Sequence, residues 1–250
     1  MSSAERPGYH LPPGTLAPVD IDLDRKCLTR SAGASIGKKY LMAAAGLFWC
    51  FFVLMHLVGN FQLFLGAEKY NAYSEFLISL GKLLYVMEIA LVLALLGHAV
   101  LGVIVSLQNS AARPVGYEVD RAKGDRNLAS NTMIWTGILV IVFIVLHLLH
   151  FKYAADHPKA MLDGKEVTDF HGMVVDLFQS PLYVLTYLVA VAVLGVHLYH
   201  ALQSSLRTLG WFSADSQACI QKTSKAFGIA IALGYASIPI WAILVKGAGS

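Results

Sequence analysis

Five runs of apolar residues dominate this chain, and each is close to the ~20 residues that an α-helix needs to cross a bilayer. They cover residues 40–65, 83–107, 131–153, 181–207 and 226–245. Hydrophobic residues make up 56% of the sequence and charged residues only 14%, whereas a soluble domain carries roughly 25% charge. Because backbone polar groups in lipid must be paired within the segment, we predict an all-α integral membrane bundle of five transmembrane helices.

The segments outside these runs indicate the domain organisation and the topology. Residues 1–35 are polar and rich in proline and glycine, so we expect an irregular N-terminal arm followed by a membrane domain over 36–250. Thirteen of the 19 Lys and Arg residues lie in the arm or in the loops after the second and fourth runs. Basic residues concentrate on the cytoplasmic side. We expect a multi-pass protein of the cell (inner) membrane, with its N-terminus cytoplasmic and its C-terminus outside.

Cysteine spacing and net charge exclude several classes of site and partner. Cys27, Cys50 and Cys219 form no CxxC or CxxCH motif, which argues against c-type haem, cysteine-ligated iron–sulfur clusters and structural zinc in this chain. The net charge is only +3, and the basic residues flank apolar runs, where topology explains them. We therefore expect the lipid bilayer, and no nucleic acid, as a partner.

Histidines lie inside the apolar runs, where ionisable side chains are costly and usually functional. Six of the nine do so: His56, His98, His147, His150, His197 and His200. Four of the six lie at matching depths. His56, His147 and His197 each stand sixteen residues after the start of their run, and the offset of His98 is fifteen. At 1.5 Å per residue, each lies roughly 22–24 Å into its helix.

These depths arrange the four histidines in two levels, because consecutive helices of an up-down bundle run in opposite directions. His56 and His147 share a level near the outer face, and His98 and His197 share one near the cytoplasmic face. In a core of ~30 Å the two levels are roughly 15 Å apart. Two imidazoles across one cavity are the axial ligands of a six-coordinate b-type haem. The first four helices are thus predicted to form a bundle that binds two haems.

The i, i+3 spacing leaves two alternates open. His150 follows His147 by three residues and His200 follows His197 by three, so either member could face inward. Depth favours His147 and His197 as iron ligands, and His150 or His200 would then contact haem propionates, lipid headgroups or a quinone.

Glycines beside the histidines admit two interpretations. Gly59, Gly97 and Gly195 either leave room for a flat porphyrin or allow the close helix packing that membrane interfaces favour.

Several short stretches occur in an order and spacing that are typical of one family. They are His56-Leu57-Val58-Gly59-Asn60, His98 with Ala112-Arg113-Pro114-Val115-Gly116-Tyr117, His147-Leu148-Leu149-His150-Phe151, Ser180-Pro181-Leu182-Tyr183, and His197-Leu198-Tyr199-His200 with Leu209-Gly210-Trp211-Phe212. In these stretches the chain resembles the cytochrome b subunit, or membrane anchor, of succinate dehydrogenase and fumarate reductase, in its single-subunit, five-helix, two-haem type. The resemblance covers nearly all of residues 35–245.

The resemblance implies a ligand set and partners. It implies His56 with His147 for the outer haem and His98 with His197 for the inner one. It also implies an FAD-containing flavoprotein subunit, which handles succinate or fumarate, and an iron–sulfur subunit. The chain would be the subunit of the quinone-linked enzyme that does not bind dicarboxylate, carrying electrons between the iron–sulfur subunit and a quinone, which in two-haem relatives is menaquinone.

Relatives place the quinone near the outer haem, beside a carboxylate at the outer end of helix one or in the loop that follows. Glu75 is the candidate for this quinone site and Glu68 the second, with Gln62 and Asn60 after them; the sequence identifies no other catalytic residue. Some relatives carry a glutamate two residues before the helix-four ligand, proposed for proton movement. Here that position is Gly195, so that route does not carry over.

Other hypotheses account for intramembrane histidines as well. A different dihaem membrane cytochrome b, of the b561 or hydrogenase type, also pairs histidines between helices. A transporter could use histidines for protons, and a structural anchor could have kept them without haem; both of these predict a haem-free protein.

Overall fold

The computed structural model describes residues 21–111, 132–211, 213 and 215–247. The chain divides into two compact units, Met1–Gly37 and Lys38–Ser250. In the first unit the described residues are helical and begin helix α1 (Ile21–Asn60). The irregular backbone expected for the arm is therefore wrong for residues 21–35, and residues 1–20 lie outside the described part. Pro18 is the last proline of the arm, and the Leu, Arg, Lys and Ala residues that follow favour helix.

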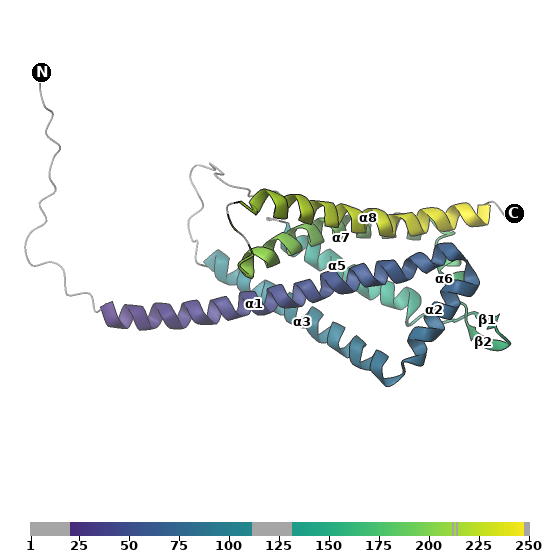
Figure 1. Cartoon of the computed structure of the whole chain (residues 1–250), viewed down its shortest axis with the longest axis horizontal. Coiled ribbons are helices and arrows are strands. Elements are labelled where there is room, and N and C mark those ends of the chain that lie inside the picture. Colours follow the sequence, from purple (N-terminus) through teal and green to yellow (C-terminus); the bar gives the residue numbers. More distant parts are fainter. Residues whose placement is uncertain (1–20, 112–131, 212, 214, 248–250) are drawn as a thin grey trace, which may run out of the picture. The chain divides into compact units, whose positions relative to one another are not determined.

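Within the described residues, five helices are long and apolar enough to cross a membrane, which confirms the predicted all-α architecture of five spans. They are α1 with its 3-10 continuation η1 (Phe61–Leu65), α3 (Lys82–Ala111), α5 (Met133–Phe151), α7 (Pro181–Thr208) and α8 (Gln217–Gly247). Figure 1 shows that α3 runs in the direction opposite to the part of α1 from Lys38 onward and that α5, α7 and α8 continue to alternate in direction. The five candidate spans indicate a multi-pass membrane protein.

The ends of the helices differ from the apolar runs where polar residues continue a helix. α8 begins at Gln217, earlier than the run at 226–245, and it passes through Pro239 without ending. The residues from Gln217 to Lys225 contain neither proline nor glycine, so nothing in this stretch opposes a helical backbone. Hydropathy therefore locates a span and not the full length of its helix.

A short β-hairpin lies in the segment that follows α5, outside the five apolar runs of the sequence. Strands β1 (Lys159–Leu162) and β2 (Lys165–Thr168) pair antiparallel, with Leu162 opposite Lys165. The two residues between them have φ values of 49° at Asp163 and 78° at Gly164. Asp-Gly is a preferred sequence for the type I′ hairpin turn, which needs positive φ at both positions. The hairpin is the one departure from helix among the described elements.

Two short helices complete this end of the unit, and one buried amide joins them. They are α2 (Ala67–Ser79) and α6 (Phe170–Leu177). Asn71 of α2 is only 3% exposed; its Nδ2 donates to Asp169 Oδ1 at 2.9 Å, and its Oδ1 accepts from the His171 backbone N–H at 3.1 Å. Asp169 also caps α6 by accepting from the Gly172 N–H at 2.9 Å. The side chain of Asn71 thereby ties α2 to the first turn of α6.

The packed core of the second unit lies between α1, α6, α7 and α8. Helices α7 and α8 approach each other closely at two glycines. A Cβ added to Gly195 would lie 2.7 Å from the carbonyl oxygen of Gly228 and 2.8 Å from Cβ of Ala232. Neither neighbour is the end of a flexible side chain, so the helices could not absorb this Cβ without moving apart. Small residues allow this kind of backbone approach in membrane interfaces.

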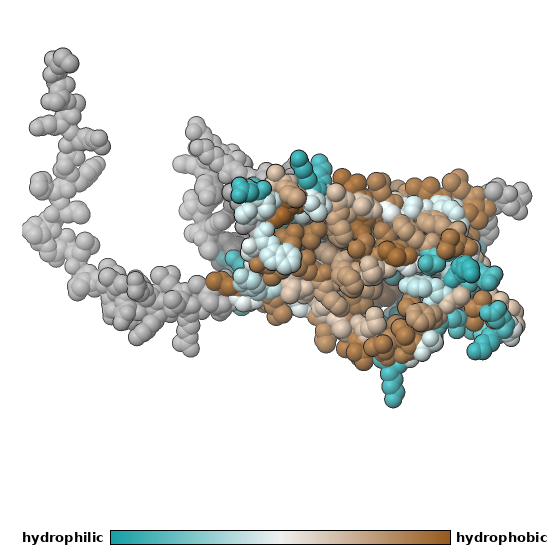
Figure 2. Space-filling view, viewed as in Figure 1, coloured by the Kyte–Doolittle hydropathy of each residue, from teal (hydrophilic) through white to brown (hydrophobic). Residues whose placement is uncertain are grey.

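Helices α3 and α5 are packed quite differently, since neither buries any of its described residues. Large apolar side chains on them are exposed, among them Leu93 of α3 and Trp135 of α5. The face seen in Figure 2 is hydrophobic over the helices, and hydrophilic residues gather toward their ends. Exposed apolar surface on this scale is characteristic of a face that meets lipid or a partner.

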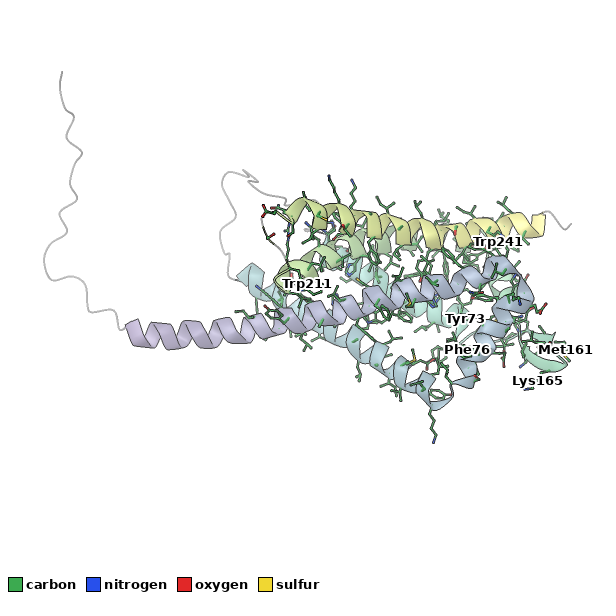
Figure 3. The ribbon with its side chains drawn as sticks, viewed as in Figure 1. Tyr73, Phe76, Met161, Lys165, Trp211 and Trp241 are labelled. Carbon is green, nitrogen blue, oxygen red and sulfur yellow. The ribbon has the colours of Figure 1, made fainter. Side chains whose placement is uncertain are left out.

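Aromatic side chains mark the two ends of the helices. Figure 3 places Trp211 at the end where α7 finishes, and Tyr73 and Phe76 of α2 toward the opposite end, near the hairpin residues Met161 and Lys165. Trp211 is 69% exposed. Tryptophan and tyrosine concentrate at the two water interfaces of a bilayer, so this distribution fits helices that cross from one interface to the other.

Candidate functional site

Two of the predicted histidines, His56 of α1 and His147 of α5, lie together. Their ring centroids are 5.9 Å apart and their planes cross at 86°. Phe52, one turn before His56 on α1, stacks on it with centroids 5.3 Å apart and planes at 15°. Phe143 and Phe151 lie one turn to either side of His147, at 5.9 and 5.2 Å. The outer pair is therefore a crossed pair of imidazoles in an aromatic surrounding.

The other two, His98 of α3 and His197 of α7, form a second pair. Their centroids are 6.4 Å apart and their planes cross at 80°. The structure thus brings together the same partners that the depths in the sequence place at common levels. No group of three or more His, Cys, Asp or Glu that could hold a metal ion occurs among the described residues, so each pair stands as two imidazoles.

Each inner histidine has a hydrogen-bond partner at Nδ1. His98 Nδ1 lies 3.1 Å from the carbonyl oxygen of Met42 on α1. A carbonyl only accepts, so the proton of the neutral His98 ring is on Nδ1 and the lone pair is on Nε2, the free nitrogen that an iron ligand needs. His197 Nδ1 lies 3.1 Å from Thr136 Oγ1 on α5, and a hydroxyl can donate or accept in this contact.

In the outer pair, one histidine has no such hydrogen bond at Nδ1. His147 Nδ1 is buried and has no hydrogen-bond partner among the described residues. Beyond His56 on the same helix, Asn60 Nδ2 donates to the His56 carbonyl oxygen at 2.7 Å, and Asn60 Oδ1 accepts from Tyr70 OH at 3.0 Å. Asn60, a weak quinone-site candidate from sequence, thus links the backbone at His56 to α2.

Among the described residues, the ring contacts of both alternate histidines are with tyrosines and not with another histidine. His150 Nδ1 lies 3.0 Å from Tyr187 OH on α7, and its ring packs edge-on against Tyr183 at 4.9 Å. His200 is 7% exposed, and its Nε2 is buried without a hydrogen-bond partner among the described residues. Its ring lies 4.1 Å from that of Tyr199. Geometry therefore favours His147 and His197 over these alternates as members of the pairs.

The glycines that touch the histidines are not the ones next to them in sequence. A Cβ on Gly46 of α1 would lie 3.1 Å from Cε1 of His98, and one on Gly137 of α5 would lie 3.4 Å from Cε1 of His197. By contrast, a Cβ on Gly97 would meet nothing within 4 Å, and Gly195 serves the α7–α8 contact. Each inner ring is approached by a glycine of the neighbouring helix, a contact that spacing along a single helix does not reveal.

Gly59, the third glycine singled out from sequence, faces the Tyr73 ring of α2. It serves the contact between α1 and the short helix at its end. Close packing, one of the two interpretations left open by the sequence, is thus the one that fits Gly59 and Gly195.

The carboxylates predicted for the quinone site lie on α2. Glu75 is half-buried, and Glu68, in the first turn, is exposed. Gln62 lies half-buried on η1. These placements put Glu75 at the end of the unit where α1 and η1 finish, without joining it to either histidine pair.

An ion pair that the apolar runs do not reveal lies between α3 and the end of α5. Lys152 Nζ pairs with Glu88 Oε1, and the two side chains are 38% and 34% exposed. Glu88 stands inside the second candidate span, Lys82–Gln108. A carboxylate within an apolar run indicates a functional or a paired side chain. Glu88 could therefore have been recognised from the sequence.

His171 lies in the first turn of α6, outside the five apolar runs, and packs against aromatic rings. Its ring lies 6.5 Å from that of Tyr70 and 5.9 Å from that of Trp241. Burial lowers the pKa of the His171 imidazole, and the nearby Asp169 carboxylate raises it in part. Burial likewise raises the pKa of the Tyr70 phenol to about 12. The end of the unit where α1 and η1 finish, which is the outer end in the predicted topology, thus carries a half-buried aromatic cluster.

The donor geometry of both pairs fits axial ligation of haem. Imidazole nitrogen binds a transition metal at ~2.0 Å, so two rings on opposite sides of one metal have centres roughly 6 Å apart. The observed separations are 5.9 and 6.4 Å. The free Nε2 of His98, and that of His197 when its Nδ1–H is held by Thr136, are the groups such a cofactor would use in the inner pair; in the outer pair the Nδ1 of His147 has no partner among the described residues to hold its ring. The assignment of these four residues as haem ligands stays a prediction.

Comparisons of the chain with protein-family models, with curated proteins and with solved structures find no match.

Proposed function

We propose that this chain is the membrane-anchor cytochrome b subunit of a succinate:quinone oxidoreductase, with His56 and His147 holding an outer b-type haem and His98 and His197 an inner one. The observation that carries the proposal is the presence of two crossed histidine pairs, with centroids 5.9 and 6.4 Å apart, joining four candidate membrane spans. The order and spacing of the family-like stretches support the choice of enzyme.

A bis-histidine haem supplies reversible one-electron transfer. The residues of the chain would bind the haems, orient the axial histidines and enclose the outer pair. The inner histidines present Nε2 because Met42 and Thr136 hold their Nδ1 atoms, while Phe52, Phe143 and Phe151 cover the outer pair with apolar surface. Such a shell limits the access of water, and this is one of the ways in which a protein sets a redox potential.

The two levels would let electrons cross much of the bilayer, between an iron–sulfur subunit on the cytoplasmic side and a quinone near the outer face. Moving one charge across 100 mV is worth ~2.3 kcal/mol, so the direction of transfer is sensitive to the membrane potential. The orientation rests on the distribution of Lys and Arg. The basic loops 113–126 and 207–225 are the candidates for docking the iron–sulfur subunit. The first lies outside the described residues and the second lies largely within them.

We place the quinone, with menaquinone as the proposed species, at the outer end and retain Glu75 as its candidate carboxylate. α2, which carries Glu75, is tied to α6 through Asn71 and to α1 through Asn60. Gly195 offers no carboxylate, and the contact with Gly228 leaves no space for one. Protons of the quinone reaction would therefore be exchanged at the outer end without the helix-four route of some relatives.

Reduced-minus-oxidised spectra and pyridine haemochrome analysis of the purified complex test the haem assignment. We expect a b-type α-band and two haems per chain. His56→Ala and His98→Ala should each remove one haem, whereas His157→Ala, in the loop before β1, should remove none. A complex without haem would refute the proposal and favour a transporter or a haem-free anchor.

The partner subunits test the choice of enzyme. Purification of the native complex through this chain should recover a flavoprotein with succinate dehydrogenase activity and an iron–sulfur protein, with electron transfer to a menaquinone analogue. Two haems together with hydrogenase subunits, or with no partner, would instead indicate another dihaem membrane cytochrome b.

A further inference from the structure

The inner histidine pair is supported from both sides by helices that carry no histidine at its level. α1 supplies the Met42 carbonyl oxygen to His98 Nδ1 at 3.1 Å, and Gly46 lies against the same ring. α5 supplies Thr136 Oγ1 to His197 Nδ1 at 3.1 Å, and Gly137 lies against that ring. For each imidazole, one neighbouring helix supplies both an oxygen close to Nδ1 and a glycine beside the ring.

We propose that Thr136 is a positioning residue for the inner haem site: its hydroxyl accepts the Nδ1–H of His197 and so directs the unprotonated Nε2 toward the iron. The inference rests on the proposed function, in which His197 is an axial ligand. It adds a residue that neither the histidine pattern nor the family-like stretches single out.

The direction of the hydrogen bond follows from the other contacts of Thr136. Its Oγ1 lies 3.1 Å from the carbonyl oxygen of Thr132 and 3.1 Å from that of Met133. A hydroxyl has one proton and two lone pairs, and carbonyl oxygens only accept. With the proton directed at one of the two carbonyls, a lone pair of Oγ1 faces His197, and in this arrangement the imidazole is the donor. A neutral imidazole has one proton, so Nε2 carries the lone pair.

This contact has two consequences for a metal ligand. It selects the tautomer that can coordinate through Nε2, and it fixes the rotation of the ring about its bond to the chain. An N–H···O bond on the far nitrogen also makes the ligating nitrogen more basic, and losing such a partner typically costs ~10–100-fold in metal affinity. Gly137 lies beside the same ring, where an added Cβ would be at ordinary contact distance, 3.4 Å from Cε1.

The effect should be confined to the inner site. His98 receives the same support from a backbone carbonyl, which side-chain substitution does not remove. His147, in the outer pair, has a buried Nδ1 without a partner among the described residues, so it does not depend on Thr136.

The experiment compares Thr136→Val, which removes the hydroxyl at nearly constant volume, with Thr136→Ser, which keeps it. Thr186→Val is the matched control, because Thr186 Oγ1 also bonds a carbonyl four residues back, at 2.8 Å to Leu182, and is exposed. Each variant is made in a His56→Ala background, which leaves the inner site, and in a His98→Ala background, which leaves the outer one. Haem per chain, the rate of haem transfer to excess apomyoglobin, and the midpoint potential are measured.

In the His56→Ala background we expect Thr136→Val to release haem ~10-fold faster or more. Its midpoint potential should shift upward, because a less basic imidazole stabilises ferric iron less. Thr136→Ser and Thr186→Val should match their parent. In the His98→Ala background no Thr136 variant should change the haem. Thr136→Ala, which lacks the hydroxyl without adding a methyl group, should repeat the result of Thr136→Val.

Unchanged release and potential for Thr136→Val in the inner-site background would overturn the inference. Equal losses in both backgrounds would overturn it too, since they would mean general destabilisation of α5. A wild-type complex without haem would instead refute the proposed function itself. The haem content of the wild-type complex is therefore measured before any Thr136 variant is made.

Discussion

Gly195→Ala tests the claim that this position is a close helix contact and cannot hold a longer side chain. The added Cβ would lie 2.7 Å from the Gly228 carbonyl oxygen and 2.8 Å from Ala232 Cβ. The optimal separation of such atoms is ~3.5 Å or more, so α7 and α8 would have to move apart by about 0.7 Å at this point. Overpacking on this scale typically costs ~1–3 kcal/mol.

Gly97→Ala is the matched control, because Gly97 also lies inside a long apolar helix and its added Cβ would meet nothing within 4 Å. Both substitutions gain the preference of alanine over glycine for helix, up to ~1 kcal/mol. That gain cancels when the two variants are compared. Gly195→Ala should therefore be less stable than Gly97→Ala by about 1–3 kcal/mol.

The free energy of unfolding can be measured by titrating the purified protein in mixed micelles with sodium dodecyl sulfate, following helicity by far-UV circular dichroism. Equal stability of the two alanine variants would refute the packing argument. Gly195→Glu, which introduces the residue that some relatives carry, should be less stable than Gly195→Ala, because it adds a carboxylate to the same contact. If Gly195→Glu were as stable as wild type, the family's proton route could be built here after all.

Three other predictions concern the outer end, the α3–α5 ion pair and the crossed rings. Asn71→Leu removes the hydrogen bonds to Asp169 and to the His171 N–H, and should cost ~2 kcal/mol, seen as faster hydrogen exchange at the start of α6; unchanged exchange there would contradict the link. Lys152→Met leaves Glu88 without its partner near the membrane core and should destabilise by ~1–2 kcal/mol, whereas the double variant with Glu88→Gln should recover most of this loss; additive losses would show that the pair contributes nothing. Because the imidazole planes of both pairs cross at 80–86°, both haems should give strongly anisotropic low-spin EPR signals, and rhombic signals typical of parallel rings would contradict the observed geometry.

The sequence alone was sufficient for the five spans and for the depths of the histidines. A bilayer admits helices because their backbone groups are hydrogen-bonded within the segment. Each apolar run long enough to cross the bilayer therefore predicts one span. The fixed rise of the helix then converts residue offsets into depth. His56, His98, His147 and His197 were chosen on that basis, and the structure sets the same residues opposite one another.

Some local features were present in the sequence and were not used. The Asp163-Gly164 dipeptide between Lys159 and Thr168 is a hairpin signal, and Glu88 interrupts an apolar run. The helical extension of α1 into residues 21–35 follows a stretch whose last proline is Pro18. Hydropathy does not register these features, because each depends on backbone conformation or on pairing.

Only the tertiary structure decided which groups on neighbouring helices meet. The rotation of a helix about its axis is set by its packing partners, as where Gly195 meets Gly228, and not by its own sequence. For that reason the sequence could name glycines beside the histidines but not Gly46 and Gly137, which face them from other helices. It could place His197 at the right depth but not show that Thr136, sixty-one residues earlier, holds its ring.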